Sequence, residues 1–78
     1  MKKKYVITNN GLPILFDEAL IHKYVSSNYV IASAGFCEIL FNSSENKITV
    51  KCWGESSSLH IRSKPIEDEK ILEAFLND

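Results

Sequence analysis

Glycine and proline are scarce in this chain, and their scarcity excludes several classes of site. The 78 residues include only three glycines and two prolines. Gly11, Gly35 and Gly54 stand far apart, so the chain holds no glycine-rich phosphate loop and no dinucleotide-binding fingerprint. The spacing of a nucleophile elbow is missing as well. The local motifs of nucleotide-dependent and hydrolytic enzymes are therefore absent.

Long hydrophobic runs are also missing. Apolar runs such as residues 29–34 are far shorter than the roughly 20 residues that a membrane-spanning helix needs. Residues 2–4 are lysines that lead directly into the strand-like segment 5–8, without the apolar core of a secretion signal. These features predict a cytoplasmic protein that does not bind a membrane.

The chain also lacks an excess of either charge, and it has few cysteines. Nine Lys and Arg residues stand against ten Asp and Glu residues, for a formal net charge of -1. Nucleic-acid binding would therefore need a local basic patch. Cys37 and Cys52 are too few for a disulfide framework, and we expect free thiols. We predict no metal site, because tetrahedral zinc needs four ligands, and no cofactor.

The overall composition is that of a folded domain. Apolar residues make up 45% of the chain and charged residues 24%, which is close to ordinary globular usage. A chain of 78 residues builds one hydrophobic core and has no room for a second folded unit. We therefore predict a single small domain over residues 1–78, too small for the deep cleft of a large enzyme.

Strand-like segments and turn residues alternate near the N-terminus. Residues 5–8 and 12–16 flank Asn9-Asn10-Gly11, whose residue types tolerate the positive φ of hairpin turns. These segments predict a first hairpin. Pro13 cannot donate a ladder hydrogen bond, so the second strand of this hairpin should lie at a sheet edge or carry a bulge.

A short helix and a long interrupted strand are expected next. Asp17 can cap a helix over residues 18–25. Residues 29–41 are rich in β-branched and aromatic side chains, which favour a strand. Gly35 interrupts this segment and predicts a bulge, bend or break rather than one straight strand.

The pairing of side chains across strands predicts a three-stranded meander. If Phe41 faces Ile48, then Cys37 faces Cys52, and on the other surface Glu38 meets Lys51 and Phe36 meets Trp53. A second register places Cys52 opposite Leu59 and Val50 opposite Ile61, with Lys51 beside His60 and Thr49 beside Arg62. The resulting inner face is apolar and consists of Cys37, Ile39, Phe41, Ile48, Val50, Cys52, Leu59 and Ile61.

The C-terminal segment is expected to be a helix that covers this inner face. Pro65 ends the last strand, and the acidic residues 67–69 suit the first turn of a helix. The acidic side chains from Glu67 to Glu73 should face solvent. An apolar stripe at helical spacing is formed by Ile71, Leu72, Phe75 and Leu76. The predicted fold is α+β, in which a small antiparallel sheet of hairpin and meander packs against a C-terminal helix.

Residues that could carry chemistry do not form a recognisable constellation. Cys37 and Cys52 fall on the apolar inner face, where a cysteine acts as a small hydrophobic side chain. A thiol-dependent enzyme or redox protein is the weakest of the alternatives that we consider. His22 lies in the short helix, and we expect it to be solvated. We name no catalytic residue and do not expect an enzyme.

The outer face of the predicted sheet is the candidate binding surface. Phe36, Leu40 and Trp53 would form an apolar patch there, which is typical of an interface. Our leading hypothesis is a non-catalytic interaction module that self-associates as a homodimer through this patch. Alternatively, the first hairpin or the short helix folds back over it. The polar rim of the patch would be Glu38, Lys51, His60 and Arg62.

A second hypothesis for the same face is single-stranded nucleic-acid binding. Trp53 would stack on bases while Lys51, His60 and Arg62 follow the phosphates. Glu38 in the middle of the patch opposes this reading. The lysines at residues 2–4 are its only other support, unless they form a solvated tail.

Overall fold

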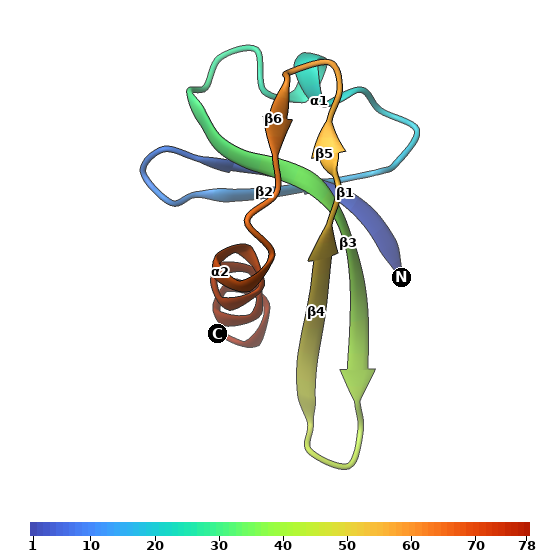
Figure 1. Ribbon diagram of the computed structural model, residues 1–78. Coiled ribbons are helices and arrows are strands. Elements are labelled where there is room, and N and C mark those ends of the chain that lie inside the picture. Colours follow the sequence, from blue (N-terminus) through green and yellow to red (C-terminus); the bar gives the residue numbers. More distant parts are fainter.

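A four-stranded antiparallel sheet with one long helix against it forms the body of the protein, in a computed structural model that describes residues 1–78 (Figure 1). The predicted α+β class is confirmed, with its N-terminal hairpin, its antiparallel sheet and its C-terminal helix. The strands of the sheet are β1 (Lys2–Thr8), β2 (Pro13–Phe16), β3 (Ile31–Asn42) and β4 (Lys47–Trp53), in the order β2-β1-β3-β4. A small ladder of β5 (Glu55–Ser56) and β6 (Ile61–Arg62) and the helices α1 (His22–Val25) and α2 (Pro65–Asn77) complete the fold.

The first hairpin forms as its turn residues predict. β1 pairs antiparallel with β2, and Gly11 in the turn has a φ of 84°, where a side chain would be strained. Pro13 lies opposite Ile7 on the outermost strand of the sheet. The edge position of β2 is therefore confirmed. Pro13 has no N–H to donate, and an edge strand tolerates this because it has a neighbouring strand on one side only.

The short helix is smaller than the segment 18–25 that we predicted. Only residues 22–25 are helical, and Ile21, with an extended backbone, stands at the N-cap. The Asp17 carboxylate does not cap this helix, since it accepts from the Ala19 N–H at 2.8 Å and closes a turn. A short helix forms too few backbone hydrogen bonds to offset the free energy of nucleation, and most of the segment therefore forms turns.

Strand β3 passes through Gly35 without a break. It runs over 12 residues and bends as it crosses the sheet (Figure 1). The register irregularity of this strand lies near its start, opposite Ile7 and Thr8, rather than at Gly35. Of the predicted alternatives of a bulge, a bend or a break, β3 has a bend, and it has neither a register shift nor a break at Gly35.

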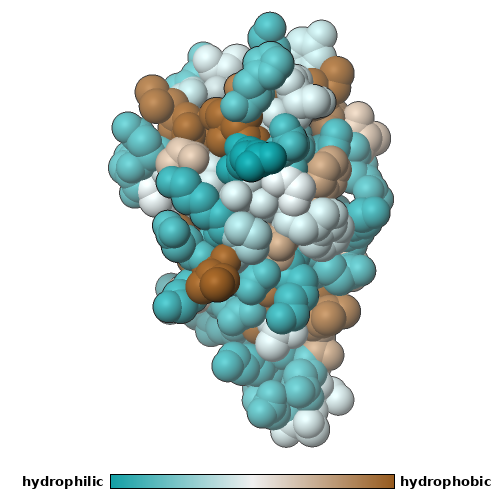
Figure 2. All heavy atoms as spheres, in the orientation of Figure 1, coloured by the Kyte–Doolittle hydropathy of each residue, from teal (hydrophilic) through white to brown (hydrophobic).

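The pairing of β3 with β4 has the predicted register. Cys37 faces Cys52, Glu38 faces Lys51 and Phe36 faces Trp53. The hairpin projects from the rest of the molecule (Figure 1), and its tip is hydrophilic (Figure 2). The register follows from matching apolar with apolar side chains and opposite charges with each other.

The predicted three-stranded meander does not form. Gly54 has a φ of 82° and turns the chain out of β4, after which β5 pairs with β6 through Glu55 opposite Arg62 and Ser56 opposite Ile61. Lys51 is therefore not beside His60, nor Thr49 beside Arg62. The strand that pairs with the other edge of β3 is instead β1, which forms a ladder with it from Lys2 to Thr8.

Helix α2 protects the free edge of β4 through its side chains. The N–H groups of Ile48, Val50 and Cys52 donate to side-chain oxygens of α2 at 2.8, 2.9 and 2.8 Å. The acceptors are Asn77, Glu73 and Glu69 respectively. A four-residue step on a helix spans about 6 Å, and a two-residue step on a strand spans about 6.8 Å. The spacing of the acceptors along α2 therefore matches the spacing of the N–H donors along β4. Glu69 and Glu73 thus face the strand backbone rather than solvent alone, which corrects our expectation.

The hydrophobic core lies on both faces of the sheet. Leu72 of α2 packs with Tyr5, Cys37, Val50 and Cys52, which confirms a helix over the predicted inner face. Phe75 of the predicted apolar stripe is 54% exposed, however. Leu59 and Ile61 lie on the opposite face, against Val6, Phe16 and Ala34, because the β5–β6 hairpin folds across the outer side. Neither helix is long and apolar enough to cross a membrane.

Candidate functional site

The outer face of β1, β3 and β4 carries the aromatic pair that the sequence singled out. The rings of Phe36 and Trp53 lie with their centroids 6.4 Å apart and their planes at 22°. Trp53 is 39% exposed and Leu40 is 50% exposed. We name this surface the Trp53 face and define it by Lys2, Lys4, Phe36, Glu38, Leu40, Lys51 and Trp53.

Lysines of β1 lie over the aromatic rings. The Nζ atom of Lys2 is 5.9 Å from the Trp53 ring centroid, and that of Lys4 is 5.8 Å from the Phe36 ring centroid. Both distances are within the range of a cation–π attraction. Residues 2–4 belong to strand β1, so the reading of these lysines as a solvated tail was wrong.

Glu38 lies in the middle of the Trp53 face, as predicted, but its charge is compensated. The amino group of Met1 is 2.7 Å from its carboxylate, and Lys2 and Lys51 are its neighbours on the two adjacent strands. Cations therefore outnumber anions on this face, a local imbalance that the net charge of the chain conceals.

His60 and Arg62 lie outside the four-stranded sheet. His60 is exposed next to β6 and has a φ of 57°, and Arg62 lies opposite Glu55. The β5–β6 hairpin and Val25 of α1 cover the end of the outer face around Ala34. The first hairpin does not fold back over the patch, and Trp53 and Leu40 remain exposed.

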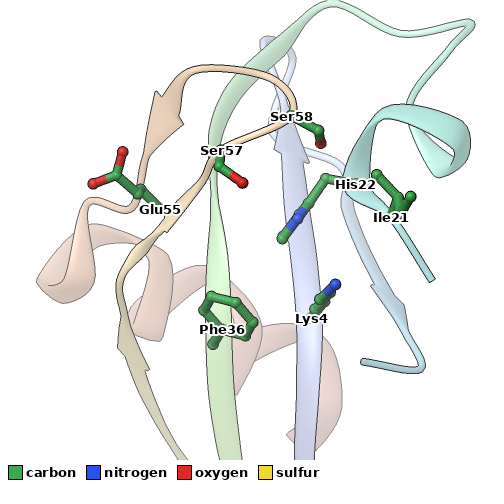
Figure 3. A pocket seen from close by; sticks show the side chains of 7 residues that line it. All are labelled: Lys4, Ile21, His22, Phe36, Glu55, Ser57 and Ser58. Carbon is green, nitrogen blue, oxygen red and sulfur yellow. The ribbon is translucent and has the colours of Figure 1, made fainter. Parts of the chain in front are cut away.

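A pocket of about 340 Å³ adjoins the Trp53 face and shares Phe36 with it. Figure 3 shows its lining side chains, which come from β1, β3, the α1 region and the β5–β6 hairpin. None of the lining residues from the hairpin was predicted to be functional, since no local motif marks them. The lining residues are Lys4, Ile21, His22, Phe36, Glu55, Ser57 and Ser58.

His22 is buried beside this pocket, which corrects our expectation of a solvated histidine. It is 4% exposed and stands edge-on to the rings of Phe16 and Phe36, at 5.2 and 5.9 Å. Its Nε2 donates to the Gly35 carbonyl at 2.9 Å. Burial, together with the nearby Lys4 charge, holds the pKa of His22 below its usual value. The ring is therefore neutral near pH 7, with a proton on Nε2 and a lone pair on Nδ1.

The two thiols have the character of core side chains. Cys37 and Cys52 are free and buried, and burial raises the pKa of Cys37 to about 11 and that of Cys52 to about 12. Since the thiolate is the reactive form, these values oppose a redox or nucleophilic role. No group of three His, Cys, Asp or Glu residues is placed to hold a metal ion.

The raised thiol pKa values predict a loss of stability at alkaline pH. Above the unfolded value of 9.0, the unfolded chain releases thiol protons that the folded chain keeps, so the free energy of unfolding falls as pH rises. Each thiol contributes a slope that approaches about 1.4 kcal/mol per pH unit. Urea denaturation between pH 9 and the ordinary Tyr5 value of 10.0 measures this slope. The Cys52→Ala variant should show about half of it, and an equal slope in both proteins would contradict the assignment.

Comparison of the chain with protein-family models, with curated proteins and with solved structures finds no match. The Trp53 face and the pocket beside it are therefore the candidate functional site. Sequence reasoning considered Lys2 and Lys4 as support for nucleic-acid binding but did not place them on the Trp53 face. Testing residues 2–8 against β3 as an antiparallel pair would have brought them onto the face, with Lys2 opposite Glu38.

Proposed function

We propose that the protein is a non-catalytic interaction module that binds its partner through the Trp53 face. The observation that carries the proposal is the exposure of Trp53 and Leu40, at 39% and 50%, on a face whose other end is covered by the β5–β6 hairpin. Exposed aromatic and aliphatic side chains within a charged rim are typical of interfaces. We also propose a cytoplasmic location, which the free thiols of the facing residues Cys37 and Cys52 favour.

The first partner that we propose is a second copy of the chain. A two-fold interface places the same surface of each copy against the other, so it needs a face that is complementary to itself. The Trp53 face has Glu38 directly beside Lys51, and the two charges can pair across a two-fold axis while Leu40 and Trp53 pack at the centre. A small domain with a limited core gains stability by sharing apolar surface in this way.

Single-stranded nucleic acid is the second candidate partner, and the position of Lys2 and Lys4 favours it. Their ammonium groups lie over Trp53 and Phe36, so cations and rings occupy one surface. Aromatic rings stack on bases of any sequence, and lysines neutralise the phosphates that link them. Binding of this kind weakens steeply as salt is added, which distinguishes it from apolar self-association.

The Leu40→Glu variant tests the face for both partners. A carboxylate beside Glu38 repels phosphates and costs desolvation in an apolar interface, so we expect the dissociation constant to rise roughly tenfold or more. Light scattering over a concentration series measures self-association, and fluorescence anisotropy with a labelled single-stranded oligonucleotide measures the second candidate.

Leu12→Glu is the matched control for this experiment. Leu12 is 47% exposed, close to the 50% of Leu40, and it lies beside the β1–β2 turn rather than on the Trp53 face. We expect this variant to bind as the unsubstituted protein does. Equal behaviour of both variants and the unsubstituted protein, in both assays, would remove the Trp53 face as the binding surface.

A further inference from the structure

We propose that the pocket beside the Trp53 face binds the phosphomonoester group of a nucleotide, at the end of a single strand that lies on that face. The proposal rests on the nucleic-acid function given above, and it names the part of the ligand that the pocket takes. The pocket has a volume of about 340 Å³. This volume is at the small end of the range for ligand sites, and it suits the terminal group of a strand rather than several nucleotides.

Lys4 supplies the one charge that is directed into the pocket. Figure 3 shows the Glu55 carboxylate pointing away from Lys4 and from His22. Glu55 has its own cationic neighbour, because it lies opposite Arg62 in the β5–β6 ladder. Lys4 donates to the Leu20 carbonyl at 2.7 Å and keeps two further N–H donors. The pocket therefore favours an anion.

A free hydroxyl adds a second donor to the pocket. Among the serines of the β5–β6 hairpin, Ser56 and Ser58 lie within hydrogen-bond distance of each other at 3.3 Å, whereas the Ser57 hydroxyl has no partner within the chain. Figure 3 shows the His22 ring between Ser57 and Lys4. Ser57 and Lys4 can therefore donate to oxygen atoms of one anion, and hydrogen bonds of this kind are strengthened by the charge of the acceptor.

His22 supplies an acceptor, and this selects phosphate among the anions. Its Nε2 donates to the Gly35 carbonyl at 2.9 Å, so the neutral ring has its lone pair on Nδ1. Nδ1 has no partner within the chain and is not enclosed by protein atoms. A phosphomonoester monoanion carries a P–OH group that can donate to Nδ1, while its other oxygens accept from Lys4 and Ser57. Sulfate has no such proton.

The position of the pocket explains why the end of a strand enters it. Phe36 belongs both to the Trp53 face and to the pocket, and the Lys4 Nζ atom is 5.8 Å from its ring centroid. Beyond Phe36 the outer face is closed by the β5–β6 hairpin, whose Leu59 and Ile61 pack on the sheet. A strand whose bases stack on the Trp53 face therefore ends at the pocket, with its terminal phosphate beside Lys4.

Fluorescence anisotropy with internally labelled single strands tests the proposal. The strands carry a 5′-phosphate, a 3′-phosphate or neither, and the pH is set near the second pKa of a phosphomonoester, about 6, so that the monoanion is present. We expect one phosphorylated strand to bind roughly tenfold more tightly than the unphosphorylated strand. Equal affinities of all three strands would overturn the pocket assignment and leave binding at the Trp53 face intact, whereas no binding by any strand would overturn both.

Competition with small anions tests the chemistry of the pocket and the source of the phosphate. The thymidine monophosphate of matching polarity should displace the phosphorylated strand, whereas sulfate at the same ionic strength should not. Equal competition by sulfate would contradict the role of the His22 lone pair. A mononucleotide that binds as tightly as the strand would make a free nucleotide the ligand, and it would overturn the assignment to a strand end.

Substitutions separate the pocket from the Trp53 face. Ser57→Ala removes one donor and should abolish most of the roughly tenfold preference for the phosphorylated strand, without a change in affinity for the unphosphorylated one. Ser43→Ala is the matched control, since Ser43 is also exposed and lies in the β3–β4 turn, outside the pocket. Leu40→Glu should weaken binding of every strand and keep the preference. An unchanged preference in Ser57→Ala would contradict the assignment.

Discussion

The Asp68→Ala variant is expected to be largely unfolded under conditions in which the unsubstituted protein is folded. Asp68 is 1% exposed, and its carboxylate accepts from the Tyr5 hydroxyl, from the Ser33 hydroxyl at 2.7 Å and from the Lys64 N–H at 2.8 Å. Alanine leaves all three donors without a partner. Breaking a buried charged network of this kind costs about 3–5 kcal/mol, which equals the stability that one small core supplies.

Urea denaturation followed by circular dichroism measures this loss. Glu67→Ala is the matched control, because Glu67 is the exposed neighbour of Asp68 in the first turn of α2. We expect that substitution to change the free energy of unfolding by about 0.5 kcal/mol or less. Similar unfolding curves for the two variants would show that Asp68 does not hold α2 to the sheet.

The Gly35→Ala variant is expected to lose about 3 kcal/mol of stability through overpacking. A Cβ atom at Gly35 would lie 2.6 Å from the Trp53 carbonyl oxygen and 3.1 Å from the Ser63 Cβ atom. The first of these is a backbone atom next to the turn at Gly54, so β3 and β4 must separate to make room. The shift would also move Trp53 relative to Phe36.

Gly11→Ala is the control for the glycine substitution itself. Gly11 has nothing within 4 Å of its added Cβ, so alanine there only strains a backbone with a φ of 84°. The expected cost of that strain is about 1 kcal/mol. Denaturation curves should therefore give Gly35→Ala a clearly lower free energy of unfolding than Gly11→Ala. The reverse order would exclude close packing as the reason for a glycine at residue 35.

Local pairing was predictable from the sequence, whereas the path of the chain after β4 was not. The β3–β4 register followed from complementary pairs such as Glu38 with Lys51, because a slip by one residue would have turned each apolar side chain to the wrong face. Residues 59–62 also match β4 by apolar alternation, yet the left-handed backbone of Gly54 directs them across the outer face. Alternation alone does not distinguish these two outcomes.

In the candidate site, too, contacts between residues of one hairpin were predictable, whereas contacts between distant segments of the chain were not. Phe36 and Trp53 were placed together correctly because they belong to one hairpin. The position of Lys2 and Lys4 beside the rings was not predicted, because it depends on pairing with a strand that lies far along the chain. His60 and Arg62 had been assigned to the face through the meander register, which was wrong. The Glu73 carboxylate was assigned to solvent because helical spacing does not reveal that a strand edge runs beside it.

Light scattering together with acrylamide quenching of Trp53 tests most directly whether the Trp53 face is the binding surface. Trp53 is the single tryptophan of the chain and is 39% exposed in the isolated protein. We expect a dimer in which Trp53 is protected and becomes quenchable on dilution to monomer, or a monomer in which a single-stranded oligonucleotide confers that protection. A monomer at every concentration, with Trp53 quenching that no oligonucleotide alters, would contradict it.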